Sequence, residues 1–290
     1  MCVTCGCGGS GESVVSLDEH EHVHADGTRH RHEHHHEHGH DDDRHGQSHG
    51  HVHGHDHVHE HRHDLTVPGR DRHTVELETQ ILGKNQLIAE RNRGWLAGRG
   101  VLALNMVSSP GAGKTTLLER TLNDLKGEID IAVVEGDQAT SNDAERIRAT
   151  GVRAVQINTG TGCHLEADML ERAIRLLEPQ RNSLLLIENV GNLVCPALFD
   201  LGERAKVVLF SVTEGEDKPL KYPHMFAAAS VVLLSKIDLL PHVRFDAERA
   251  RANALSVNPQ LVFIGLSAYT GEGFSHWYGW LKSQLMGRTV

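Results

Sequence analysis

One segment constrains the fold of this 290-residue chain more than any other: the glycine-rich stretch SSPGAGKTT, residues 108–116. It follows an apolar run and opens a segment with helical periodicity. Gly113, Lys114 and Thr115 fit the end of the phosphate-loop pattern G-x-x-x-x-G-K-S/T, while Ser108 stands where the pattern has its first glycine. A glycine-rich turn without a ligand is the plainer alternative, but the strand–loop–helix order favours a nucleotide site.

The residue types in this loop suit phosphate binding. Glycines let backbone N–H groups approach phosphates, and the N-terminus of the following helix adds partial positive charge. Lys114 is expected to bridge the terminal phosphates and the Thr115 hydroxyl to bind Mg²⁺. The predicted nucleotide contacts here are Gly111, Ala112, Gly113, Lys114, Thr115 and Thr116.

Beyond the loop, short apolar runs alternate with amphipathic segments. The runs predict strands at 101–108, 129–134, 152–157, 183–188, 205–212, 230–236 and 260–266. The segments between them predict helices at 114–126, 141–150, 164–178, 218–228, 244–257 and 273–286. Together with the phosphate loop, this alternation predicts an α/β phosphate-loop domain, with a mostly parallel sheet covered by helices on both faces and ligands at the carboxyl ends of the strands.

Two further predicted strands end in carboxylates. The second ends VVEGDQ, where Asp137 is expected to contact Mg²⁺ or water, although a lone Asp after a strand is also a common turn or cap residue. The fourth ends LLLIENVGN, where Glu188 replaces the usual aspartate. Gly191 follows Glu188 by three residues, and its backbone N–H is expected to contact the γ-phosphate. The loop would then become ordered when the triphosphate binds, as a switch loop does. We therefore expect Lys114, Asp137, Glu188 and Gly191 to serve catalysis, with Thr115, Asp137 and Glu188 at Mg²⁺.

The segment Ser235-Lys236-Ile237-Asp238 follows a later apolar run and resembles the N/T-K-x-D element that reads guanine. Asp238 would accept two hydrogen bonds that adenine cannot supply, and Lys236 would pack its stem over the base. Ser267 and Ala268 resemble the last guanine-contact loop. Taken alone, this match is weak. Because it follows the phosphate loop in the expected order along the chain, it favours GTP over ATP.

Composition divides the chain into four zones. Residues 1–11 form a Cys/Gly tip, 12–66 are polar and His-rich, 67–100 carry a helical apolar stripe, and 101–290 form the GTPase domain. Of the 24 histidines, 19 lie between His20 and His63. A zone so poor in apolar residues cannot bury enough surface to fold, so we expect 12–66 to be disordered without metal. Its imidazoles suit exchangeable Ni²⁺ or Zn²⁺ binding, with an inert linker as the alternative.

Cysteines supply two further candidate metal sites. Cys2, Cys5 and Cys7 form a C-x₂-C-x-C tip of converging thiolates, rather than three unengaged surface thiols. Within the domain, Cys163 and His164 are adjacent. A lone cysteine is usually a buried small hydrophobe. The Cys-His pair and Cys195 near the switch segment favour a nickel or zinc site of Cys163, His164 and Cys195, whose missing ligands would come from a twofold dimer interface.

Charge and hydropathy exclude several classes of protein. The net charge is −10, which argues against a nucleic-acid partner and against an anionic membrane surface. No run of about 18 apolar residues is present, and an odd cysteine count makes a poor disulfide framework. We expect no signal peptide, because the first residues lack a basic region followed by an apolar run. We expect a cytoplasmic protein with reduced thiols.

Together these motifs resemble the nickel-insertion GTPases of nickel–iron hydrogenase maturation, the HypB family. The resemblance rests on the N-terminal C-x₂-C-G-C, SSPGAGKTT, EGDQAT, TGCH, ENVGNLVCP and SKIDLL, and it covers 101–290 plus the tip. Ser108 and Glu188, which depart from the general nucleotide pattern, look normal for this family.

The resemblance implies GTP hydrolysis, a homodimer formed with GTP, and nickel transfer to the hydrogenase large-subunit precursor. It also implies a small zinc/nickel metallochaperone partner of the HypA type, docking on residues 75–96, although packing of that stripe on the core is an equal alternative. A urease accessory GTPase would show a Cys-Pro-His element and lack the N-terminal cysteine motif. A nickel storage or detoxification protein would use the His-rich zone, but the intact GTP site argues against a vestigial domain.

Overall fold

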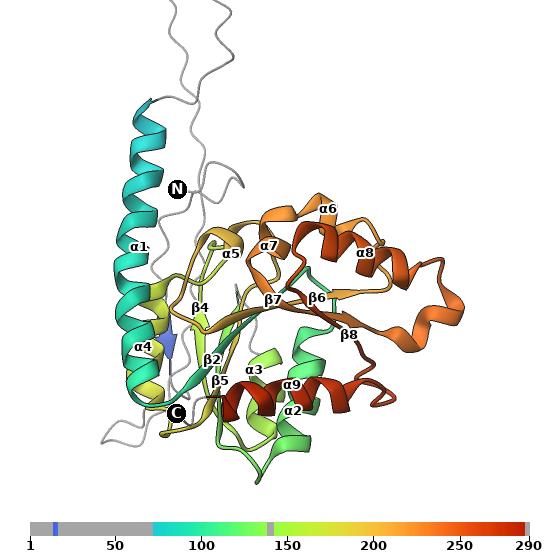
Figure 1. The fold of residues 1–290 in the computed structure, drawn as a ribbon. Helices are drawn as coiled ribbons and strands as arrows, with labels where there is room; N and C mark the ends of the chain where they lie inside the picture. The colour runs from blue at the N-terminus through green and yellow to red at the C-terminus, as the bar shows by residue number, and fades with distance from the viewer. Residues whose placement is uncertain (1–13, 17–71, 138–141, 288–290) are drawn as a thin grey trace, which may run out of the picture. The chain divides into compact units, whose positions relative to one another are not determined.

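A computed structural model describes residues 14–16, 72–137 and 142–287 (Figure 1). Eight strands among these residues form one sheet in the order β1-β4-β3-β5-β2-β6-β7-β8. Their bounds are β1 Val14–Ser16, β2 Leu102–Ser108, β3 Ile131–Asp137, β4 Arg153–Asn158, β5 Leu184–Glu188, β6 Ala205–Ser211, β7 Ala229–Ser235 and β8 Val262–Gly265. Strands β2 to β8 pair in parallel, and β1 pairs antiparallel with β4 at the edge. The predicted mostly parallel α/β sheet is confirmed.

Helices cover both faces of this sheet. Their bounds are α1 Arg72–Gly98, α2 Lys114–Leu125, α3 Asn142–Ala149, α4 Ala167–Leu177, α5 Cys195–Leu198, α6 Lys218–Lys221, α7 Pro223–Ala228, the 3₁₀ helix η1 Ile237–His242, α8 Ala247–Val257 and α9 Phe274–Met286. Side chains of α2, α3 and α9 pack on one face, and those of α1, α4, α7 and α8 on the other. Figure 1 shows α1 beside α4, and α9 beside α2. None of these helices is long and apolar enough to cross a bilayer.

Strand β2 lies inside the sheet, and its sequence LALNMVS is apolar except for Asn105 and Ser108. Leu102, Leu104 and Met106 pack under α2 and α9, while Ala103 and Val107 point to the opposite face. All of β2 is buried. Because both faces lie under helices, neither set of alternating positions can be polar without a partner.

The predicted elements differ from the structure mainly at their ends. The helix expected at 218–228 is two helices, α6 and α7, because Pro223 lacks the backbone N–H that a continuous helix would need. The helix expected from residue 164 begins at Ala167, since Cys163 and His164 lie in the preceding turn. The short helices α5 and η1 were not predicted.

One correction concerns the zone expected to be disordered. Val14–Ser16, within 12–66, form strand β1 against the edge of β4, with Val15 opposite Ile157. Two adjacent β-branched valines favour extended backbone, and an edge strand offers unpaired backbone groups. The remainder of 12–66 and all of the cysteine tip lie outside the described residues.

Helix α1 buries a face that contains only part of the apolar stripe predicted from Val75 to Leu96. Leu96 of the stripe is buried but Leu87 is 73% exposed, and the other buried positions are Asn85, Ala89 and Asn92. These positions follow the i, i+4, i+7, i+11 spacing of one helix face. The stripe omits Asn85 and Asn92, whose side-chain amides can be buried because they form hydrogen bonds with backbone groups of the domain.

Close approach of α1 to the domain depends on Gly202. Its φ is +91°, and a Cβ there would lie 2.7 Å from Asn92 Cβ and closer still to the Ala89 carbonyl oxygen. Gly202→Ala should therefore lower the free energy of unfolding by about 2–4 kcal/mol, from left-handed strain plus overpacking. Urea denaturation measures the change.

Gly94→Ala is the matched control on α1, because nothing lies within 4 Å of a Cβ at Gly94. Replacing a glycine inside a helix should stabilise the protein by about 0.5–1 kcal/mol. Equal effects of the two substitutions would contradict the close packing of α1 at Gly202.

Candidate nucleotide and metal sites

The phosphate loop joins the end of β2 to the start of α2. Gly111 and Gly113 have φ values of +74° and +92°, which other residues rarely adopt. The loop borders a cavity of about 560 Å³. Ser108, where the general pattern has glycine, is fully buried, and its hydroxyl donates to the Ser109 carbonyl oxygen at 2.8 Å.

Most of the predicted nucleotide residues line this cavity. They come from the carboxyl ends of four strands and from the start of α2: Gly111, Ala112, Gly113, Lys114, Thr115, Thr116, Asp137, Glu188, Gly191 and Lys236. Gly191 lies against the phosphate loop, because a Cβ there would be 3.2 Å from Pro110 Cα. The sheet therefore brings together motifs that are far apart in the sequence.

Glu188 is the most constrained carboxylate in the cavity. Its Oε1 accepts a hydrogen bond from the Thr115 hydroxyl at 2.8 Å and lies 3.5 Å from Lys114 Nζ. Burial raises the pKa of Glu188, and the neighbouring Lys114 and Thr115 oppose that rise. Its Oε2 is buried without a hydrogen-bond partner.

Sequence reasoning missed Glu135, which lies beside Glu188 in the register of β3 and β5. Burial, followed by the charges of Glu188, Asp137 and Asp143, raises the pKa of Glu135 to about 8. Its Oε2 also lacks a partner. A glutamate directly after the apolar residues of β3, near the carboxyl end of the strand, was the available signal. Unpaired carboxylate oxygens beside a threonine hydroxyl are donors that suit Mg²⁺.

Two residues of α3 also border the cavity and were not predicted. Asp143 and Arg146 line it together with Asp137. The Arg146 guanidinium donates to the Thr116 hydroxyl at 3.1 Å and to Glu119 at 2.7 Å. Residues 138–141, which connect Asp137 to α3, lie outside the described residues.

The base-recognition motif is attached to the phosphate loop by two hydrogen bonds. The Ser235 hydroxyl donates to the Ala112 carbonyl oxygen at 2.7 Å, and Lys236 Nζ donates to the Gly111 carbonyl oxygen at 2.8 Å. Lys236 holds a φ of +60°, a strained conformation for a residue with a side chain. Ser235 thus anchors the base-recognition motif to the phosphate loop, although its side chain is shorter than the asparagine of the general pattern.

The other predicted base contacts lie outside the lining of this cavity but next to the same motif. The Ile237 N–H donates to the Leu266 carbonyl oxygen at 3.3 Å, which joins the Asp238 turn to the loop after β8. Ser267 is buried and its hydroxyl oxygen accepts from the Thr270 N–H. The Ala268 carbonyl oxygen accepts from Arg120 at 3.1 Å.

Cys163, His164 and Cys195 converge as predicted. Cys163 Sγ lies 3.1 Å from Cys195 Sγ and 3.6 Å from His164 Nδ1. The three ligand atoms lie within 4.8 Å of one another, and all three residues are buried. Two sulfurs and one imidazole at this spacing fit a thiophilic divalent ion such as Ni²⁺ or Zn²⁺.

The surroundings of His164 favour its neutral, metal-binding form. Burial lowers its pKa to about 4. Its ring packs on Phe199 with centroids 4.0 Å apart, and its Nε2 lies 3.8 Å from a Glu166 carboxylate oxygen. His164 Nδ1 lies on the side of the sulfurs, and Nε2 is buried without a hydrogen-bond partner.

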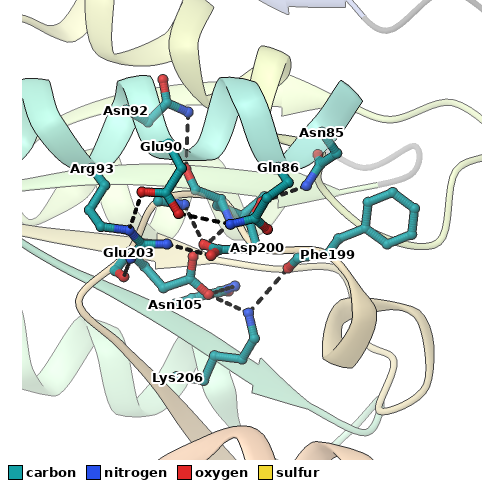
Figure 2. A network of polar contacts seen from close by, with 12 residues as sticks. Asn85, Gln86, Glu90, Asn92, Arg93, Asn105, Phe199, Asp200, Glu203 and Lys206 are labelled. Atoms are coloured by element: carbon teal, nitrogen blue, oxygen red, sulfur yellow. Dashed lines mark hydrogen bonds and ion pairs between the residues drawn. The ribbon is translucent and has the colours of Figure 1, made fainter. Parts of the chain in front are cut away.

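A buried amide connects the cavity to this cluster. Asn189 lines the cavity, and its Oδ1 accepts from the Leu165 N–H at 3.1 Å, one residue after His164. Its Nδ2 donates to Asn105 Oδ1, and Asn105 Nδ2 donates to Glu203 Oε1. Figure 2 shows Glu203 paired with Lys206 and lying under Arg93 of α1. Sequence reasoning found none of this network.

Comparison with known proteins agrees with this geometry. Residues 102–264 match the family described as CobW/HypB/UreG, nucleotide-binding domain. The Hydrogenase maturation factor HypB of Escherichia coli K12 is 59% identical over 213 residues, which cover 73% of each chain.

Two solved structures are similar at 40% sequence identity and a TM-score of 0.66, and each covers 70% of this chain. One is HypB from Archaeoglobus fulgidus, of which 99% is covered. The other is HypB from Helicobacter pylori in complex with nickel, of which 96% is covered. The chain therefore belongs to the HypB hydrogenase maturation factors, within the CobW/HypB/UreG nucleotide-binding family.

Proposed function

We propose that this chain is a GTP-hydrolysing nickel metallochaperone that delivers nickel to the large-subunit precursor of a nickel–iron hydrogenase. One observation carries the proposal. The segment from Glu188 to Cys195 begins in the phosphate cavity and ends in the Cys163/His164/Cys195 cluster. A change at the phosphates is therefore separated from a metal-binding sulfur by seven residues.

In this proposal the residues of the cavity divide the work of GTP hydrolysis. Lys114 holds the terminal phosphates, and the N-terminus of α2 supplies backbone N–H groups to them. Mg²⁺ held by Thr115, Asp137 and Glu188 would neutralise charge between the β- and γ-phosphates. Gly191, packed on the phosphate loop, would then respond to the presence of the γ-phosphate.

Nickel is the cargo of the buried cluster. Two thiolates and one imidazole leave a four-coordinate ion short of one ligand. A second copy of the chain would complete the site. Val194 and Leu198, which flank Cys195, are 39% and 51% exposed and would be covered in such a homodimer. GTP binding would favour dimer assembly, and hydrolysis would release nickel to a small metallochaperone of the HypA type and then to the hydrogenase precursor.

The His-rich zone supports a second, compatible function. Its 19 histidines between His20 and His63 provide many imidazoles of moderate affinity. We propose that this zone stores nickel in the cytoplasm and that the cysteine tip holds nickel or zinc. The HypB relatives and the N-terminal cysteine motif favour hydrogenase maturation over the urease accessory role.

Asp238→Asn should change the nucleotide preference from guanine to xanthine. The amide keeps one acceptor oxygen but presents an NH₂ donor in place of the second, which opposes the guanine amino group and suits the xanthine carbonyl, so kcat/KM for GTP should fall about hundredfold and that for xanthosine triphosphate should rise. Phosphate release with both nucleotides measures the exchange. Asp246→Asn, at the N-cap of α8, is the control. Unchanged GTP hydrolysis would remove Asp238 from base recognition.

Cys195→Ser should weaken nickel binding at the sulfur cluster of the domain. The test uses the full chain with Cys2, Cys5 and Cys7 changed to Ser, because only Cys163 and Cys195 then remain. Added Ni²⁺ should give sulfur-to-nickel charge-transfer absorption in this background, and Cys195→Ser should weaken nickel binding at least tenfold by removing one thiolate. The same absorption and affinity in both proteins would refute the cluster as the nickel site.

A further inference from the structure

The face of α1 that packs on the domain is unusual because its two buried polar residues bind only backbone groups. Asn85 and Asn92 are 6% and 1% exposed and lie seven residues apart, on the same side of the helix. A buried amide costs free energy unless its donors and acceptors are paired. Their partners therefore show what this face of α1 holds in place (Figure 2).

Each asparagine connects the same two segments of the domain. Asn85 Oδ1 accepts from the Ala167 N–H at 2.8 Å, and its Nδ2 donates to the Asp200 carbonyl oxygen at 2.7 Å. Asn92 Nδ2 donates to the Ala167 carbonyl oxygen at 2.8 Å and to that of Leu201 at 3.0 Å. We call these four hydrogen bonds the α1 staple.

The two stapled segments are those that carry the metal ligands. Ala167 lies three residues after His164, and Asp200 lies five residues after Cys195. Between Cys195 and Asp200, Phe199 packs directly on the His164 ring. The staple thus fixes the spacing between the segment that supplies Cys163 and His164 and the segment that supplies Cys195.

We propose that Asn85 and Asn92 are positioning residues for the Cys163/His164/Cys195 metal site, so that α1 and the bound metal stabilise one another. This inference rests on the proposed metal site. A site whose ligand segments are already held in place loses less conformational freedom when it binds. Thermodynamic linkage makes this coupling reciprocal. If displacing or straining α1 lowers the affinity for the metal by some factor, bound metal makes that displacement of α1 less favourable by the same factor.

The staple also connects to the phosphate cavity. Arg93, next to Asn92, donates to the Glu203 carbonyl oxygen at 2.7 Å. The Glu203 carboxylate continues through Asn105 to Asn189, which lines the cavity. One set of buried hydrogen bonds therefore joins the phosphate cavity, the metal cluster and α1. We expect a ligand at either site, or a partner on the exposed face of α1, to act on these bonds.

The first test measures nickel affinity in the full chain with Cys2, Cys5 and Cys7 changed to Ser, by the sulfur-to-nickel absorption. In this background Asn85→Ala and Asn92→Ala should each weaken nickel binding about tenfold, the size expected for the loss of one to two hydrogen bonds. Gln86→Ala is the matched control, because Gln86 lies on α1 and bonds only the exposed Glu90. Its nickel affinity should be unchanged.

The second test needs no substitution in the staple. Hydrogen exchange of the same Cys-to-Ser protein is compared with and without Ni²⁺. The staple predicts that nickel slows exchange in α1 from residue 85 to residue 96, as well as near the ligands, because a ligand stabilises every element that must be in place for it to bind. This measurement keeps the proposal testable if an asparagine variant does not fold.

The outcomes separate the staple from the metal site itself. Nickel binding that is weakened at least tenfold by Cys195→Ser, weakened about tenfold by the asparagine variants and unchanged by Gln86→Ala supports both. Nickel absorption with equal affinity in all α1 variants, or with exchange in α1 unaffected by nickel, overturns the staple and leaves the proposed metal site standing. Absence of the absorption from the parent protein overturns the metal site and, with it, the staple.

Discussion

The parallel pairing of β5 with β2 and β3 is the constraint on which both candidate sites depend. It places Glu188 beside Glu135 and the phosphate loop, and the Asn189 N–H on the Met106 carbonyl oxygen. The chain leaves β5 inside the phosphate cavity and reaches Cys195 within seven residues. Because helices bury both faces of the sheet, ligands bind at the carboxyl ends of its strands.

The central part of this arrangement could be predicted from sequence because it depends on local chemistry. The order of strand, phosphate loop and helix indicates where Lys114 and Thr115 lie. Adjacent Cys163 and His164, with Cys195 after another strand, indicate a shared site once the strands are known to be parallel. The division of the expected helix at 218–228 was also predictable, because proline cannot continue a helix.

The rest depended on tertiary contacts that have no local signature. Glu135 looks like a polar interruption of a strand, and its importance appears only from the register with Glu188. The asparagines of α1 look like surface residues, since no pattern in the helix marks the backbone groups that they bind in other segments. The apolar stripe of α1 was only partly informative, because Leu96 is buried whereas Leu87 is largely exposed. Hydrophobic periodicity does not mark buried positions that are held by polar side chains.

We propose that the nucleotide controls the metal through the segment between Glu188 and Cys195. The most direct test titrates the full chain, with Cys2, Cys5 and Cys7 changed to Ser, with Ni²⁺ in GDP and in a non-hydrolysable GTP analogue. Control through this segment predicts different nickel affinities in the two states, with a matching effect of nickel on nucleotide binding. Identical affinities would contradict it, because the phosphate cavity and the sulfur cluster would then act independently.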